Sequence, residues 1–150
     1  MDPYRIAVLY YFGELQYWKL PGIAADALEK GHDGPALRRL AGLMNPVQAD
    51  IPAEEIDSAF REMGVAAPLA KNETQLVLAA ETARKALYGN WNVWDAATHI
   101  SIYICGWEQP PQELQDIVSL SKKMGYARPA STQLDSELRN AMSAFLRGRE

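Results

Sequence analysis

The stretch NETQLVLAAETARKAL, residues 72–87, decides the fold class. Apolar residues recur in it at helical spacing. Asn72, followed three residues later by Gln75, matches a capping box, which is a usual start of a helix, and Gly89 is a usual stop. We therefore predict a helix that begins at Asn72 and ends before Gly89, with a buried face made of Leu76, Ala80, Ala83 and Leu87.

Similar start and stop signals lie on both sides of this helix. Prolines and carboxylates mark the expected starts, and glycines mark the expected ends. The further helices predicted in this way cover residues 4–18, 22–30, 35–43, 53–64, 93–105 and 111–124, and a last one begins at Ser131 or Thr132. The sequence thus predicts an all-α fold, a single compact domain over residues 1–150 with seven or eight short helices.

Three local details can be compared with a structure. Asp33 is the expected N-cap of the helix over residues 35–43. The helix over residues 53–64 is expected to bury Ile56, Phe60 and Met63 and to carry an Asp57–Arg61 pair on its other face. The helix over residues 4–18 is apolar almost all round, which indicates a central position.

Residues 100–105 are the weakest part of this prediction. Ile100, Ile102, Tyr103 and Ile104 are types that favour strands. A strand needs a partner, and no second strand is evident in the sequence, so we expect a helix here.

Two passages share a rhythm, in which a tryptophan is followed by a proline and then by apolar residues three apart. One runs from Trp18 through Pro35 to Leu43, and the other from Trp91 through Pro111 to Leu120. Either the chain has two similar helical halves, or the likeness is chance, because all helical proteins reuse the same caps.

Composition narrows the classes of function. Hydrophobic residues make up 48% and charged residues 23% of the 150 residues, which is typical of a globular protein. A net charge of −4 argues against nucleic acid as a partner. The single cysteine, Cys105, excludes an intrachain disulfide and indicates a reducing compartment. Neither a signal peptide nor a membrane span is recognised, so we expect no membrane association and a cytoplasmic location.

Candidates for catalysis are few. His32-Asp33 resembles the metal-binding pair of HD phosphohydrolases, but the only other histidine is His99, so the further ligands of such a site are missing. His99 and Cys105 are six positions apart, which places them on different faces of one helix. The chain contains no G-x-S-x-G, P-loop or G-x-G-x-x-G motif. We therefore expect a protein that is not an enzyme and has no metal or other cofactor.

Two features could bind a protein partner. Asp50, Glu54, Glu55 and Asp57 could steer a basic partner if they share a surface; the alternative is that they only cap and solvate a helix start. Tryptophans are favoured interface anchors, and Trp91, beside Gly89, is the best candidate for exposure. The predicted partner-binding residues are Asp50, Glu54, Glu55, Asp57, Trp91 and Trp94, and the wider aromatic group also includes Tyr88 and Trp107.

The run from Trp18-Lys19-Leu20-Pro21-Gly22 through residues 36–43, ALRRLAGL, resembles segments of small bacterial helical proteins. Some acidic proteins of this kind are immunity proteins of polymorphic toxins, which neutralise a secreted toxin. The resemblance implies a non-enzymatic module that occludes a protein partner such as a basic toxin domain. The alternatives are a small-molecule-binding or enzymatic helical domain with an aromatic-lined pocket, and a structural or oligomer-forming protein.

Overall fold

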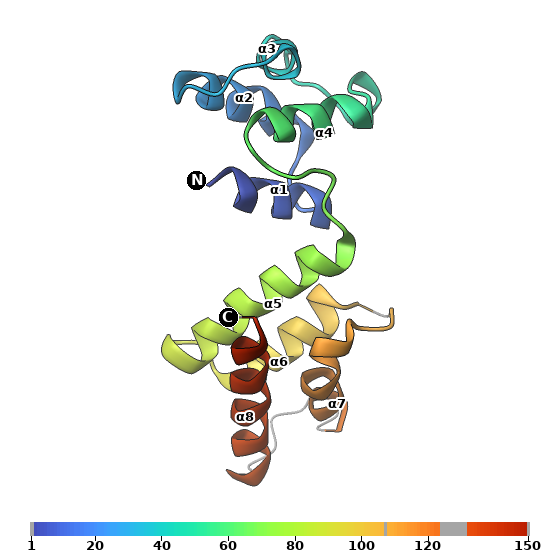
Figure 1. Ribbon diagram of the computed structural model, residues 1–150. Coiled ribbons are helices and arrows are strands. Elements are labelled where there is room, and N and C mark those ends of the chain that lie inside the picture. Colours follow the sequence, from blue (N-terminus) through green and yellow to red (C-terminus); the bar gives the residue numbers. More distant parts are fainter. Residues whose placement is uncertain (1, 107, 124–131, 150) are drawn as a thin grey trace. The chain divides into compact units, whose positions relative to one another are not determined.

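The computed structural model describes residues 2–106, 108–123 and 132–149 (Figure 1). These residues form eight α-helices with short 3₁₀ and π-helical segments, and they contain no strand. The predicted all-α class and the predicted number of helices are confirmed. The helices are α1 (Pro3–Phe12), α2 (Leu20–Glu29), α3 (Pro35–Ala41), α4 (Ala53–Glu62), α5 (Lys71–Tyr88), α6 (Val93–Thr98), α7 (Gln115–Lys123) and α8 (Thr132–Gly148).

Contacts within the chain define two compact units, Met1–Thr74 and Gln75–Glu150, here called unit 1 and unit 2. The boundary falls inside α5, and each unit is described by itself. The single domain over residues 1–150 stays a prediction. The boundary also lies between the two passages that share a rhythm, which does not by itself make one unit a repeat of the other.

In unit 1, α3 packs against both α2 and α4 (Figure 1). The predicted inner face of α4 is confirmed, because Ile56, Phe60 and Met63 are buried. α1 joins this core through Tyr10 and Tyr11, whose ring centroids both lie 5.7 Å from that of Phe60. The core residues that α2 and α3 contribute are Leu20, Ala24, Ala27, Ala36, Leu37 and Leu40.

α1 is shorter than the predicted helix over residues 4–18. Gly13 adopts the left-handed conformation, with φ +103°, and its amide donates to the carbonyls of Leu9 and Tyr10. This arrangement closes the helix, because a residue without Cβ reaches that conformation at little cost. Residues 17–19 then form a separate 3₁₀ turn.

The start of α3 is capped from another helix, so the prediction for Asp33 is wrong. Gly34 is the N-cap residue, and Asp33 instead forms an ion pair with Arg38 at 2.6 Å. The carboxylate of Glu62, at the end of α4, accepts the amides of Ala36 and Leu37 at 3.2 and 2.9 Å. A contact across the fold therefore replaces the expected local cap.

The outer face of α4 also differs from the predicted Asp57–Arg61 pair. The Asp57 carboxylate accepts a hydrogen bond from the Tyr11 hydroxyl. The Arg61 Nε donates to the carbonyl oxygen of Ala67 at 2.9 Å. Both side chains thus bind groups that only the folded unit brings near them.

α5 begins at Lys71, so the predicted capping box at Asn72 is wrong. The side chain of Gln75 is buried, and its Nε2 donates to the carbonyl oxygen of Ile104 at 3.0 Å. The buried face is also rotated from the predicted one, because Leu76 and Leu87 are only half-buried. The fully buried apolar residues of α5 are Leu78, Ala79, Ala80, Ala83 and Ala86, of which Ala80 and Ala83 were predicted.

The helix predicted over residues 93–105 is confirmed, and the strand alternative is wrong. α6 is followed directly by a π-helical segment, His99–Ile104, whose i to i+5 pattern includes the bond from the Cys105 amide to the Ile100 carbonyl at 2.9 Å. α6 packs against α7 and α8 (Figure 1). The predictions for Met124, Gly125 and Ser131 concern residues outside those described. The largest fully buried residues in unit 2 are Val93, Ile100, Leu114, Ile117, Leu138 and Met142.

Candidate functional site

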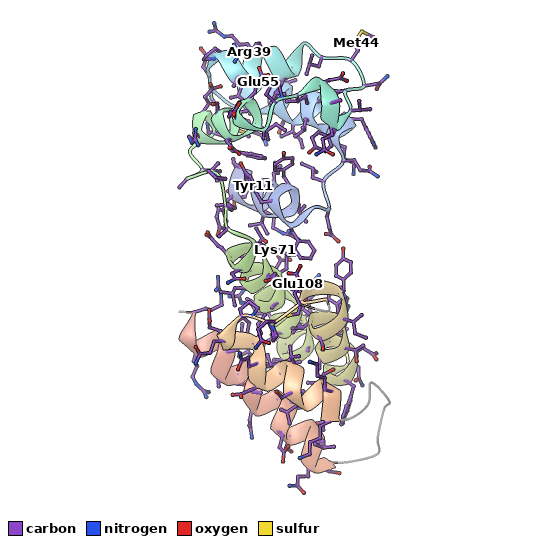
Figure 2. All side chains as sticks on the ribbon, turned by 90° about the vertical axis from the view of Figure 1, so that its right-hand side faces the viewer. Tyr11, Arg39, Met44, Glu55, Lys71 and Glu108 are labelled. Carbon is purple, nitrogen blue, oxygen red and sulfur yellow. The ribbon has the colours of Figure 1, made fainter. Side chains whose placement is uncertain are left out.

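The four predicted acidic residues mostly contact unit 1 itself. Asp50 accepts the amide of Val47 at 2.9 Å. Glu55 forms an ion pair with Arg39 of α3 (Figure 2), and Asp57 accepts the Tyr11 hydroxyl.

Glu54 is exposed in the first turn of α4, where a carboxylate faces the positive end of the helix dipole. Three of the four side chains therefore have partners that belong to the fold. This arrangement supports the alternative that these carboxylates cap and solvate a helix start. Asp50 and Glu54 are both exposed, whereas Glu55 and Asp57 are half-buried.

The two predicted tryptophans lie in different surroundings within unit 2. Trp94 is 7% exposed and belongs to the core, so its ring is not available at the surface. The side chain of Asn92 caps α6 just before it, by accepting the Trp94 amide at 2.8 Å. Trp91 is 42% exposed. Trp107 lies outside the described residues.

A tight turn after α5 positions Trp91. The amides of Gly89 and Trp91 both donate to the carbonyl oxygen of Lys85, at 3.1 and 3.2 Å. A Cβ at residue 89 would lie 2.8 Å from that oxygen, so this approach of the backbone requires glycine. The turn brings the indole back to the last turn of α5, where the Lys85 ammonium lies 5.5 Å from the centroid of the Trp91 ring.

Two further rings continue from Trp91. The centroids of Trp91 and His99 are 5.4 Å apart in an edge-to-face arrangement, and those of His99 and Tyr103 are 4.7 Å apart. Tyr103 is about half-exposed. We call Lys85, Trp91, His99 and Tyr103 the aromatic surface; it is the candidate functional site.

The π-helical segment supplies the second half of this surface. His99 and Tyr103 are four residues apart on it and lie on one side, while Ile100 and Ile104 face the core. Segments of π-helix are rare and are found frequently at functional sites. Sequence reasoning missed both residues, although an aromatic pair at four-residue spacing was the signal that could have found them.

The surroundings of Cys105 do not favour nucleophilic chemistry. The thiol is buried, and burial raises its pKa. Reactive cysteines instead have a depressed pKa and an exposed sulfur, because the thiolate is the nucleophile. Among the described residues, there is no group of three or more His, Cys, Asp or Glu side chains that could hold a metal ion.

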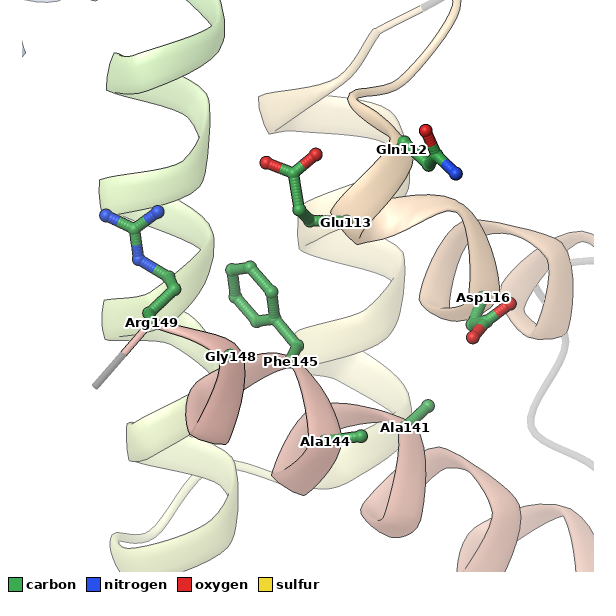
Figure 3. Close-up of a pocket in the computed structure, with 8 residues that line it drawn as sticks. All are labelled: Gln112, Glu113, Asp116, Ala141, Ala144, Phe145, Gly148 and Arg149. Atoms are coloured by element: carbon green, nitrogen blue, oxygen red, sulfur yellow. The ribbon is translucent and has the colours of Figure 1, made fainter.

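A pocket of about 450 Å³ lies in unit 2, between the start of α7 and the end of α8 (Figure 3). It shares no lining residue with the aromatic surface. Its walls carry the acidic side chains of Glu113 and Asp116 and the guanidinium of Arg149, and Phe145 supplies a ring. The remaining lining residues are Gln112, Ala141, Ala144 and Gly148.

The chain matches no protein-family model, no curated protein and no solved structure. In the part of the chain that the structure describes, no helix combines the length and the apolar character that crossing a membrane requires. The fold and the site therefore define this protein as an all-α protein with an exposed aromatic surface.

Proposed function

We propose that this chain is a non-enzymatic protein-binding module, and that the aromatic surface is its contact with the partner. The observation that supports the proposal is the continuous series of rings from Trp91 through His99 to Tyr103. Trp91 and Tyr103 are both large and substantially exposed.

Physical chemistry favours a protein partner for such a surface. Tryptophan and tyrosine are enriched among the residues that contribute most to binding energy, and they lose little conformational entropy on binding. The contacts among the rings and Lys85 hold them together before a partner arrives. A preorganised contact of this kind lowers the entropic cost of association.

The partner that we propose is a toxin domain, which the chain neutralises by occlusion as immunity proteins do. The net charge of −4 favours a basic partner, because complementary charge accelerates encounter. Since three of the four predicted carboxylates hold partners within unit 1, their role in this proposal is long-range attraction, and the rings make the contact.

The experiment measures growth rescue and binding together. The chain is co-expressed with each toxic domain encoded beside its gene, and the purified pair is examined by calorimetry. Trp91→Ala is expected to weaken binding by about 30-fold, which corresponds to roughly 2 kcal/mol for a central aromatic anchor. It should also abolish rescue while the circular dichroism spectrum stays that of the wild type.

Trp18→Ala is the matched control, because Trp18 is also an exposed tryptophan but belongs to unit 1. It should bind and rescue like the wild type. The proposal fails if no neighbouring toxic domain is bound or neutralised. The assignment of the aromatic surface fails if Trp91→Ala and Trp18→Ala have equal effects.

A further inference from the structure

An open groove of about 540 Å³ lies in unit 1, between α1 and α2. Its volume falls in the range of about 300–1,000 Å³ that is typical of small-molecule sites. All but two of its lining residues are without charge, and most of these are large and apolar. The lining residues are Ile6, Leu9, Leu15, Trp18, Lys19, Gly22, Ile23 and Asp26.

Gly22 leaves the groove open where α2 borders it. A Cβ built at this residue meets no atom within 4 Å, so the space above the backbone is open at this point of the groove. Gly22 lies in the first turn of α2. A larger residue at this position would place a side chain at the groove, which Gly22 helps to line.

The two charged residues of the groove differ in whether their charge is offset by a partner. Asp26 forms an ion pair with Lys30 at 2.9 Å, which offsets the charge of its carboxylate. The Lys19 ammonium lies 5.4 Å from the centroid of the Trp18 ring, and no described residue supplies a carboxylate partner for it. An apolar groove with an uncompensated cation at its edge is complementary to an apolar molecule that carries one negative charge.

We propose that this groove binds a small amphipathic carboxylate, of the chemical class of medium-chain fatty acids. The alkyl chain lies along Ile6, Leu9 and Ile23, and it covers the bare backbone at Gly22. The carboxylate pairs with Lys19, and the exposed indole of Trp18 flanks the chain. This site lies in unit 1 and does not depend on the protein-binding function proposed for unit 2.

The test uses calorimetry on the full chain, with decanoate below its critical micelle concentration and decanol as the uncharged probe. Gly22→Leu places a side chain in the groove and should weaken decanoate binding by about tenfold or more, because it occupies apolar surface that the ligand would bury. Ala25→Leu is the matched control: residue 25 is exposed on the same helix and does not line the groove. It should bind decanoate like the wild type.

Lys19→Gln separates the contribution of the charge from that of the apolar chain. It should weaken decanoate binding by about two- to fivefold, as expected for an exposed ion pair, and leave decanol binding unchanged. Gly22→Leu and Ala25→Leu should both keep the wild-type circular dichroism spectrum, so that a loss of binding is not a loss of folding.

Three outcomes overturn the proposal. These are no binding of decanoate, equally tight binding by Gly22→Leu and Ala25→Leu, and an unchanged affinity in Lys19→Gln. The first outcome would show that the groove is not a binding site for this class of ligand. The second would show that decanoate binds elsewhere, and the third that Lys19 does not bind the carboxylate. None of them bears on the binding of a protein partner at Trp91.

Discussion

The carboxylates at the start of α4 and the rings of the aromatic surface differ in what they contact. Glu55 and Asp57 bind Arg39 and Tyr11, which belong to their own unit. The rings of Trp91 and Tyr103 both contact His99, and Trp91 also lies beside Lys85. Trp91 is 42% exposed and Tyr103 is 48% exposed.

This difference shows which of the two features can be explained by folding alone and which indicates a binding partner. A carboxylate at a helix start stabilises the helix and costs little at the surface, so it can be explained without a partner. A cluster of exposed rings leaves apolar area in water, which folding alone does not favour. The aromatic surface is thus the better candidate for binding, although the carboxylates were predicted in full from the sequence and only Trp91 of the aromatic surface was.

The largest expected effect concerns the core beneath the aromatic surface. Ile100 is fully buried in the π-helical segment, while Ile102 in the same segment is 44% exposed. Ile100→Ala should lower the free energy of unfolding by about 2–5 kcal/mol, because it leaves a cavity. Ile102→Ala should lower it by less than about 1 kcal/mol. Urea unfolding followed by circular dichroism compares the two, and equal losses would contradict the described burial of this segment.

A smaller change in the free energy of unfolding is expected when the carboxylates of α4 are removed. Glu62→Ala removes the acceptor for the amides of Ala36 and Leu37, and losing a helix cap of this kind costs about 1–2 kcal/mol. Glu54→Ala, at the exposed start of the same helix, should change the free energy of unfolding by no more than about 0.5 kcal/mol. The same urea titration tests both variants. If they lose equal stability, the cap from α4 to α3 does not stabilise the fold.

The smallest effect concerns alkaline pH. Burial raises the pKa of Tyr10 and Tyr11 above the ordinary value of 10.0, and hydrogen bonds to Tyr17 and Asp57 add to the shifts. Above that value the tyrosines of the unfolded chain lose their protons while the folded ones keep them. The free energy of unfolding should therefore fall as the pH rises above 10.0 and be unaffected by these groups at neutral pH.

The double variant Tyr10→Phe/Tyr11→Phe should show a shallower fall between neutral pH and the alkaline range. Tyr88→Phe, which alters a ring that is 80% exposed, is the control and should fall as steeply as the wild type. Guanidinium unfolding at a series of pH values gives the slopes. A double variant that follows the wild type throughout would show that these two hydroxyls do not set the alkaline limit.

Local signals in the sequence were sufficient to predict where helices lie, but not which distant residues contact them. Proline starts and glycine stops depend on neighbouring residues, so they predicted α2 and α4 close to their observed positions. α7 begins at Gln115, four residues after the predicted start, because residues 112–114 form a 3₁₀ turn. The cap of α3 comes from Glu62, which is 25 residues from Leu37 along the chain. No local pattern indicates such a contact, and the same holds for Gln75 and the Ile104 carbonyl.

Only part of the candidate site was predicted, because local signals indicate exposure at a turn but not packing within the fold. Turn-forming neighbours indicated that Trp91 is exposed, and it is. Trp94 is only three residues further on, but the cap at Asn92 and the packing of α6 turn it into the core. His99 and Tyr103 were missed although residues four apart are neighbours on a helix. The residue types do not indicate that the segment carrying them is π-helical.

The π-helical segment His99–Ile104 also has a genetic consequence. It accommodates one more residue than an α-helical turn would, so the loss of a single codon here would leave an α-helix of ordinary pitch. Each residue of an α-helix turns by about 100°. The two rings would then be three residues apart and no longer stacked in the same way, while the core on either side could remain in place. A one-codon deletion between His99 and Tyr103 would therefore change the register of the two rings without removing either of them.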